Sequence, residues 1–140
     1  MDFAMIGPAL ALSLGCIGSA IGCGIASMAS HAVMSRVEEN HGQFIGMAVM
    51  PASQSIYGFV LMILMKNNLD GGSLSPLTGV GIGLFVGLAL LVSSAYQGMC
   101  AASGIQASAK QPAILGKCFA TLGIIESFAL FAFVFALILI

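Results

Sequence analysis

Charged side chains are so rare in this chain, and so unevenly placed, that they decide what it can fold into. Asp, Glu, Lys and Arg make up only 6% of its 140 residues, against 59% hydrophobic residues, and the mean hydropathy is +1.09. A soluble domain of this size needs far more charged surface. The charges also leave uncharged stretches longer than the about 20 apolar residues that cross a bilayer. The sequence therefore predicts an integral membrane protein.

Four apolar stretches predict an all-α fold with four transmembrane helices. Helices are favoured over strands because lipid cannot satisfy open backbone groups, and continuous apolar runs lack the alternation of barrel strands. We expect helices at about residues 5–33, 43–65, 77–108 and 118–139. The polar connections between them are 36–41, 66–76 and 110–117. The first stretch has no Lys or Arg before it and exceeds the length of a signal peptide, so we expect a retained helix.

The basic residues predict the orientation of the chain in the membrane. Three of them fall in the first and third connections, namely Arg36, Lys110 and Lys117. Lys66 alone lies on the side of the two termini. The excess of positive charge places loops 36–42 and 110–117 in the cytoplasm and both termini outside.

Several function classes are disfavoured by the composition. The net charge of -1 and the absence of basic clusters argue against a nucleic-acid partner. No GxxxxGK[ST] loop is present, so we expect a chain that is not itself an enzyme. The cysteines have no CxxC pairing and no histidine at ligand spacing, so we expect inert thiols and no metal framework. These cysteines are Cys16, Cys23, Cys100 and Cys118.

The first and third predicted helices carry stripes of glycine at four-residue spacing. The positions are Gly18 and Gly22 in the first helix, and Gly79, Gly83 and Gly87 in the third. Such a stripe lets another helix backbone approach closely in lipid. It can form a seam inside the bundle, or it can pack copies of the chain into a ring. Because four helices enclose little interior, we predict ring packing.

The chain contains an internal duplication. Residues 52–60 align with residues 126–134 at an offset of 74, and residues 19–20 match residues 94–95 at an offset of 75. Two related helical hairpins inserted in the same direction would form a parallel repeat. We place the first hairpin at 1–70 and the second, which carries Glu126, at 71–140.

Glu126 is the most informative residue of the sequence. An ionised carboxylate in the bilayer core costs from about 3 to over 10 kcal/mol, so it is seldom present without a purpose. Glu126 follows Lys117 by about 14 Å of helix, which places it near the middle of a hydrocarbon layer of about 30 Å. The first hairpin has Ala52 at the matched position. A structural hydrogen bond to a neighbouring helix is the alternative role for Glu126.

Polar oxygens gather at the depth of Glu126. Gln54 and Gln97 reach a similar depth on the second and third helices, and Ser53 and Tyr57 flank Gln54. A carboxylate, a hydroxyl and two amide oxygens suit a hard monovalent cation. The same groups could hold a protonated carboxyl by hydrogen bonds.

Pro51 loosens the second helix beside these polar residues. Proline has no backbone N–H, so the carbonyl of Met47 loses its usual partner. We therefore expect a local irregularity in the helix and a main-chain carbonyl that can supplement the side-chain oxygens.

Together these residues resemble the proteolipid of V-type ATPases, known as the c or K subunit, in its duplicated four-helix form. The resemblance covers nearly the whole chain and rests on segments 18–22, 50–58 and 96–98 and on Glu126. It implies a ring of identical subunits that rotates against a stator, with one ion carried on the glutamate that Glu126 matches.

The resemblance to the sodium-binding bacterial branch also implies a ligand set. The matching residues are Glu126, Gln97, Gln54, Ser53 and the backbone carbonyl of Met50, with Tyr57 locking the carboxylate. Ser53 stands for a threonine, Ala52 for a glycine and Met50 for a leucine of the family pattern. Because Ser53 keeps the hydroxyl, we favour Na⁺ as the transported ion, with H⁺ as the alternative. No further cofactor is implied.

The partners implied by the resemblance are further copies of the chain, a stator membrane subunit that supplies an arginine, and cytoplasmic central-stalk subunits. The implied location is a bacterial plasma membrane. Two other functions remain open. One is a dimeric proton-coupled exporter of the small multidrug type, which also has four short helices and one membrane glutamate. The other is a purely structural proteolipid ring in which Glu126 serves packing.

Overall fold

The computed structural model describes residues 3–140, and all regular secondary structure over that range is helical. Four helical segments are long and apolar enough to cross a membrane, at Phe3–Met34, His41–Asp70, Pro76–Lys110 and Pro112–Leu139. They are built from three 3-10 turns and five α-helices: η1 (Phe3–Met5), α1 (Ile6–Met34), α2 (His41–Val49), η2 (Met50–Ala52), α3 (Ser53–Asp70), α4 (Pro76–Lys110), η3 (Pro112–Ile114) and α5 (Leu115–Leu139). The predicted all-α fold with four membrane helices is confirmed.

Two of the expected connections are shorter than the sequence suggested. α3 continues through Lys66 to Asp70, and these two residues form an i,i+4 salt bridge of 2.5 Å. After α4, only Gln111 is non-helical before η3 begins. Charge marks where a helix leaves the lipid, not where it ends, and lysine is itself a good helix former. The segments 66–70 and 112–117 were therefore wrongly expected to be loop.

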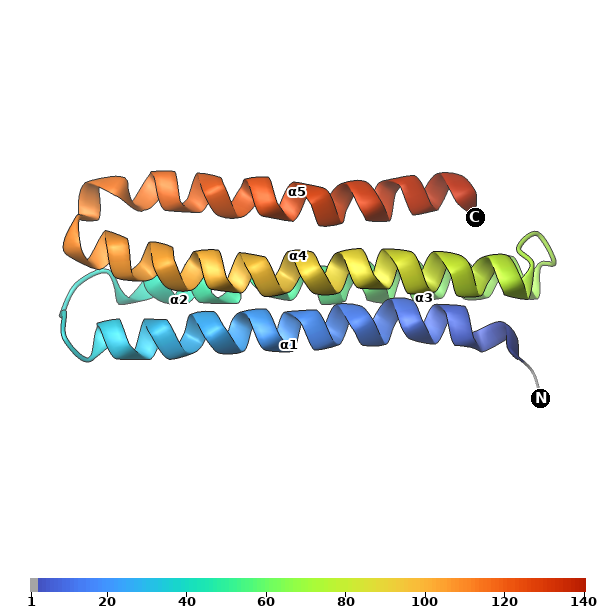
Figure 1. Ribbon diagram of the computed structural model, residues 1–140, viewed down its shortest axis with the longest axis horizontal. Coiled ribbons are helices and arrows are strands. Elements are labelled where there is room, and N and C mark those ends of the chain that lie inside the picture. The colour runs from blue at the N-terminus through green and yellow to red at the C-terminus, as the bar shows by residue number, and fades with distance from the viewer. Residues whose placement is uncertain (1–2) are drawn as a thin grey trace.

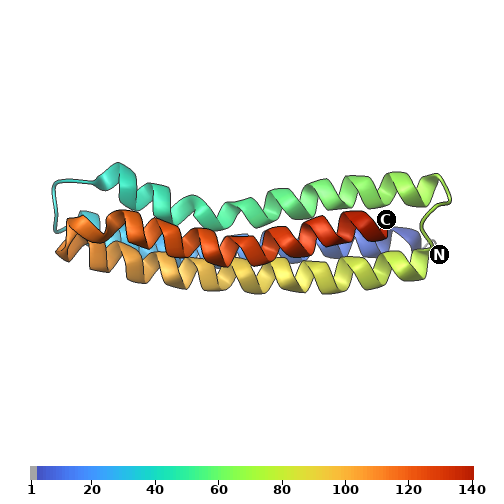
Figure 2. The same ribbon diagram turned by 90° about the horizontal axis from the view of Figure 1, so that it is seen from above.

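The second membrane segment is interrupted at Pro51, as the sequence predicts. α2 ends at Val49, η2 follows over Met50–Ala52, and α3 begins at Ser53. The missing N–H of Pro51 prevents continuous α-helical bonding at this point. Figure 2 shows α2 and α3 meeting at a shallow angle there.

The helices are arranged as two hairpins that point the same way. α1 lies alongside α4, α3 packs on α1, and α5 packs on α4 (Figures 1 and 2). Two buried apolar clusters occupy the two ends of the bundle. One contains Ala26, Phe44, Met47, Ala48, Ala101, Ile105 and Leu122, and the other contains Ala11, Leu61, Met65, Leu74, Ile82 and Ala136. Buried polar residues lie along the helices between the members of these two clusters. They include Ser19, Gln54, Ser94 and Gln97.

The glycines of α1 and α4 form a seam between these two helices. A Cβ on Gly18 would meet the backbone of Leu91, and a Cβ on Gly22 would meet the carbonyl oxygen of Ser94. A Cβ on Gly83 would meet the backbone of Gly7. Such close approach of two backbones requires residues without side chains.

The seam differs from the ring contacts that we predicted for the glycine stripes. Gly18, Gly22, Gly79, Gly83 and Gly87 are all buried within a single chain. Gly87 faces Leu10 and Leu14 of α1, and the carbonyl of Gly79 lies against Gly7. These positions are already covered by the chain's own helices, so other residues must form any contact between copies.

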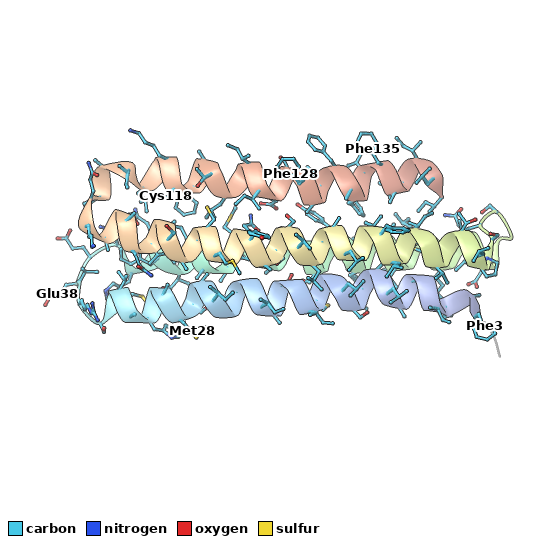
Figure 3. The ribbon with its side chains drawn as sticks, in the orientation of Figure 1. Phe3, Met28, Glu38, Cys118, Phe128 and Phe135 are labelled. Atoms are coloured by element: carbon cyan, nitrogen blue, oxygen red, sulfur yellow. The ribbon has the colours of Figure 1, made fainter. Side chains whose placement is uncertain are left out.

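The termini and the connections are divided between the two ends of the bundle. Figure 1 shows the start of α1, the α3–α4 turn and the end of α5 at one end, and the other two connections at the opposite end. Figure 3 places Phe3 and Glu38 at these opposite ends. The predicted cytoplasmic loops 36–42 and 110–117 therefore lie on the same side of the protein, although their side of the membrane stays a prediction.

Candidate functional site

Glu126 lies between a tyrosine and a glutamine contributed by two other helices. It is partly buried on α5. The hydroxyl of Tyr57 on α3 donates a hydrogen bond of 2.9 Å to Glu126 Oε1. Gln97 Nε2 on α4 lies 3.5 Å from Glu126 Oε2 and donates a bond of 3.0 Å to the carbonyl of Leu122. The carboxylate is thus held from both sides.

Two fully buried glutamines extend this network away from the carboxylate. Gln54 and Gln97 are each 0% exposed, and Gln54 Nε2 donates to Gln97 Oε1 at 3.0 Å. Ser53 Oγ lies 3.1 Å from Gln54 Oε1 and 3.1 Å from the carbonyl oxygen of Met50. The structure therefore brings together, from η2, α3, α4 and α5, all six residues for which the resemblance implies ion-binding or locking roles.

The site offers oxygens in several chemical forms. Glu126 supplies a carboxylate, Ser53 a hydroxyl, and Met50 a main-chain carbonyl. Each glutamine carries both a carbonyl acceptor and an NH₂ donor, so it can serve either a cation or a carboxylate after rotation of its amide. Such a set can bind a hard cation or stabilise a protonated carboxyl.

Pro51 and its neighbours hold the helices together beside the network. Ser94 Oγ donates a bond of 2.8 Å to the carbonyl of Pro51. Gly22 allows α1 to approach Pro51, because any Cβ on Gly22 would lie 2.8 Å from Pro51 Cβ. The irregular segment of the second membrane helix is thus fixed by both α1 and α4.

Three serines that the sequence did not single out as site residues also support the site. Ser94 binds Pro51, and Ser93 Oγ donates to the carbonyl of Ile125 at 3.0 Å. Ser19 Oγ accepts a bond of 3.0 Å from the backbone N–H of Ser55. The repeat of Ser-Ala at residues 19–20 and 94–95 was the available signal for two of them.

The ring of Tyr57 is held by an aromatic contact. Tyr57 and Phe133 stack with ring centroids 5.5 Å apart and an interplanar angle of 23°. This contact orients the tyrosine from α5, the helix that carries Glu126. The hydroxyl can then reach the carboxylate without the whole side chain being free to rotate.

Glu126 has no basic partner in the part of the chain that the structure describes. The ion pair found between residues 3 and 140 joins Lys66 and Asp70 near the end of α3. No group of three or more His, Cys, Asp or Glu side chains is found there that could hold a metal ion. Among the described residues, no Lys or Arg is thus paired with the Glu126 carboxyl.

Comparison with known proteins identifies the repeated unit. The sequence model of the ATP synthase C subunit family matches residues 6–65 and again residues 80–139. The chain belongs to this family. One family repeat covers α1 to α3 and the other covers α4 and α5, so the tandem hairpins are a duplication of the family's unit. The repeats begin at 6 and 80 and end at 65 and 139, so matching positions are 74 residues apart.

This member of the family has relatives that are named as subunits of V-type ATPases and of an A-type ATP synthase. It is 34% identical to the V-type sodium ATPase subunit K of Enterococcus hirae, over 100% of this chain and 91% of that protein. It is 33% identical to the A-type ATP synthase subunit K of Methanocaldococcus jannaschii, over 98% of this chain and 62% of that protein. It is 30% identical to the 16 kDa proteolipid of the V-type proton ATPase of Ovis aries, over 98% and 90%.

Proposed function

We propose that this chain is the ion-carrying rotor subunit of a rotary V-type ATPase and that it binds one Na⁺ at Glu126. The observation that carries the proposal is the network in which Glu126, Gln97, Gln54, Ser53 and Tyr57 meet inside a membrane bundle. A carboxylate in lipid is costly unless a cation or a proton neutralises it. One monovalent ion neutralises the single charge of Glu126.

Na⁺ is favoured over H⁺ by the number of oxygens at the site. Neutralising a carboxylate with a proton requires only one oxygen. Here the proposed ligands are Glu126, Gln97, Gln54, Ser53 and the carbonyl of Met50. A relative named as a sodium ATPase subunit K supports this choice, while another is named as a proton ATPase proteolipid. H⁺ remains the alternative cargo.

Tyr57 and Gln97 would allow the proposed site to alternate between an ion-bound state and an empty state. Both donate hydrogen bonds toward the carboxylate, so they hold Glu126 inward while the ion is bound. Release requires a competing cation, and none of the described membrane segments places a Lys or Arg beside Glu126. A stator subunit that supplies an arginine would provide it.

The rotor role follows from repeating this step around a ring of copies. The neutral site can face lipid, whereas the empty site must meet the positive charge of the stator. Each ion that crosses 100 mV exchanges about 2.3 kcal/mol with the membrane potential. Central-stalk subunits would connect the ring to the subunits that hydrolyse or synthesise ATP, so this chain is a transport subunit and not a catalytic one. We place it in a bacterial plasma membrane, with both termini outside the cytoplasm.

Carbodiimide labelling of Glu126 tests the cargo. Carbodiimides react with protonated carboxyls, so a bound Na⁺ should block the reaction. In membranes held at fixed pH, we expect added Na⁺ to suppress the labelling of the wild-type chain, while K⁺ at the same ionic strength suppresses it much less. Glu126→Gln serves as the unlabelled control. Labelling that Na⁺ leaves unchanged would replace the sodium assignment with H⁺.

The mass of the native particle and its ion-coupled ATPase activity distinguish the rotor from the dimeric exporter and from the purely structural ring. A dimeric exporter would form a small particle, whereas a rotor forms a large ring that resists detergent. Family membership favours the rotor. A purely structural ring is separated by Glu126→Gln: if this variant retained ion-coupled ATPase activity in its complex, Glu126 would serve packing alone.

A further inference from the structure

The irregular segment of the second membrane helix contains a carbonyl and an N–H that a regular α-helix would join. In such a helix each N–H bonds the carbonyl four residues earlier, which would pair Ser55 with Pro51. Here η2 covers Met50–Ala52 and α3 begins only at Ser53. The N–H of Ser55 therefore belongs to the first turn of α3, whose N–H groups have no partner within that helix. The carbonyl of Pro51 lies in the 3-10 turn before it.

Two serines from neighbouring helices bond these two backbone groups. Ser94 Oγ on α4 donates a bond of 2.8 Å to the carbonyl of Pro51. Ser19 Oγ on α1 accepts a bond of 3.0 Å from the N–H of Ser55. Ser94 is 0% exposed and Ser19 is 7% exposed, so both bonds lie inside the bundle. The two sides of the helix break are thus held by two different helices.

The two serines are equivalent positions of the internal duplication. The Ser-Ala pair at residues 19–20 matches the pair at residues 94–95. Both serines nevertheless bond the second membrane helix of the first hairpin. The corresponding helix of the second hairpin is the continuous α5, which has Ile125 at the position of Pro51. The helix break therefore lies in the hairpin that lacks Glu126.

The helix break carries proposed sodium ligands other than the carboxylate. Ser53 Oγ lies 3.1 Å from Gln54 Oε1 and 3.1 Å from the carbonyl oxygen of Met50, whose carbonyl also accepts from the N–H of Ser53. α1 follows this segment closely, because a Cβ on Gly15 would lie 2.9 Å from the carbonyl oxygen of Gln54. A rotation of the peptide groups here would move the ligand oxygens. It would leave Glu126 in place, because that residue is on α5.

We propose that Ser19 and Ser94 are positioning residues that hold the helix break open and thereby set the affinity of the site for Na⁺ relative to H⁺. The proposal rests on the proposed sodium function and adds two residues to it, neither of which is a ligand. Without both hydroxyls, the carbonyl of Pro51 and the N–H of Ser55 can bond each other and close the segment into a regular helix. Closure would displace the oxygens that bind Na⁺. A proton on Glu126 needs none of them.

Alanine variants should affect stability and ion binding in different ways. Ser19→Ala or Ser94→Ala leaves one buried backbone group without its partner, so each should lower the thermal unfolding midpoint, measured by circular dichroism in detergent. Each should also raise the Na⁺ concentration that half-protects Glu126 from carbodiimide, by about threefold or more.

The double variant separates positioning from simple support of the fold. It frees both backbone groups, which can then satisfy each other, so we expect it to recover part of the lost thermal midpoint. Its half-protecting Na⁺ concentration should nevertheless rise further, to about tenfold or more above the wild type, because the closed segment misplaces the ligands. Labelling without Na⁺ should keep the wild-type pH dependence, since Glu126 is not moved.

Ser30→Ala and Ser108→Ala are the matched controls on α1 and α4. Each removes a hydroxyl from a serine that is 2% exposed. Ser30 Oγ has no hydrogen-bond partner among the described residues, and Ser108 Oγ bonds the carbonyl of Ile105 on its own helix. Both controls should keep the wild-type Na⁺ protection. A loss of protection in the controls as large as in Ser19→Ala and Ser94→Ala would overturn the proposal.

The positioning role and the sodium function fail in different ways. Wild-type Na⁺ protection in the double variant, or midpoint losses that simply add, would overturn the positioning role and leave the sodium function intact. If Na⁺ failed to protect even the wild-type chain, the sodium function would fall, and the effect on Na⁺ affinity with it. A recovered midpoint in the double variant would still show that the two serines hold the helix break open.

Discussion

The hydrogen bond from the Tyr57 hydroxyl is the contact whose loss should most specifically weaken ion binding at Glu126. Tyr57→Phe removes the 2.9 Å bond to Oε1 but keeps the ring that stacks on Phe133. A hydrogen bond to a charged group is worth about 1.5–3 kcal/mol, so we expect Na⁺ affinity to fall by about tenfold or more. The measurement is the Na⁺ concentration that half-protects Glu126 from carbodiimide.

Tyr96→Phe is the matched control for this change. It deletes the same hydroxyl from a side chain that is 62% exposed and outside the ion site. We expect its Na⁺ protection to equal that of the wild type. Equal protection curves for the two variants would show that Tyr57 does not lock the carboxylate.

Ser53 offers a test of ion selectivity. Its hydroxyl lies 3.1 Å from both Gln54 Oε1 and the Met50 carbonyl. Ser53→Ala should weaken Na⁺ protection while leaving H⁺-dependent labelling nearly unchanged, because a proton does not need this oxygen. Ser53→Thr should strengthen Na⁺ protection, since a β-branched side chain has fewer rotamers. Ser55→Ala is the control, because the Ser55 hydroxyl donates to the carbonyl of Ala52 and not to a residue of the ion site. A loss of the same size in Ser55→Ala would remove Ser53 from the ligand set.

The sequence could predict Glu126, Gln54 and Gln97 because a carboxyl or an amide conflicts with an apolar membrane helix, whereas the role of Ser53 was implied by the family resemblance. It could not predict the roles of Ser19, Ser93 and Ser94. A serine in a membrane helix is not costly in itself, and its meaning depends on which backbone group lies opposite in three dimensions. The bonds to Pro51 and Ile125 join residues 43 and 32 positions apart, which no local pattern encodes.

The α1–α4 seam depends on glycine at particular positions. A Cβ at Gly22 would meet the Ser94 carbonyl and Pro51, so Gly22→Ala should overpack the seam at a cost of about 1–3 kcal/mol. We expect a lower thermal unfolding midpoint in detergent, measured by circular dichroism. Gly123→Ala is the control, because a Cβ at that position would meet no atom of another described element within 4 Å. An unchanged midpoint for Gly22→Ala would mean that the two helices are not so closely packed.

The membrane helices themselves were predictable, but their partners were not. Long apolar runs and Pro51 indicated the four segments and the irregularity at η2. The glycine stripes indicated close helix packing, yet a stripe carries no information about whether its partner belongs to the same chain. Burial within the chain places the five predicted glycines at the internal seam.

The orientation of the whole molecule can be tested from its connections. We expect loop 36–42 in the cytoplasm and the α3–α4 turn outside, since three of the four basic residues lie at the loop end. In cysteine-free chains, an impermeant maleimide added to sealed right-side-out vesicles should label Ser73→Cys. It should label Glu39→Cys only after permeabilisation. Both positions are exposed, so the reverse pattern would invert the assigned topology.

One ion for each chain is the central claim at the scale of the whole assembly. The most direct measurement is the equilibrium binding of radioactive sodium to purified rings, expressed per chain. We expect saturation at one Na⁺ per chain, competition by H⁺, and no saturable binding in Glu126→Gln rings of unchanged mass. Saturable binding that survives Glu126→Gln, or its absence from wild-type rings at any pH, would contradict the account.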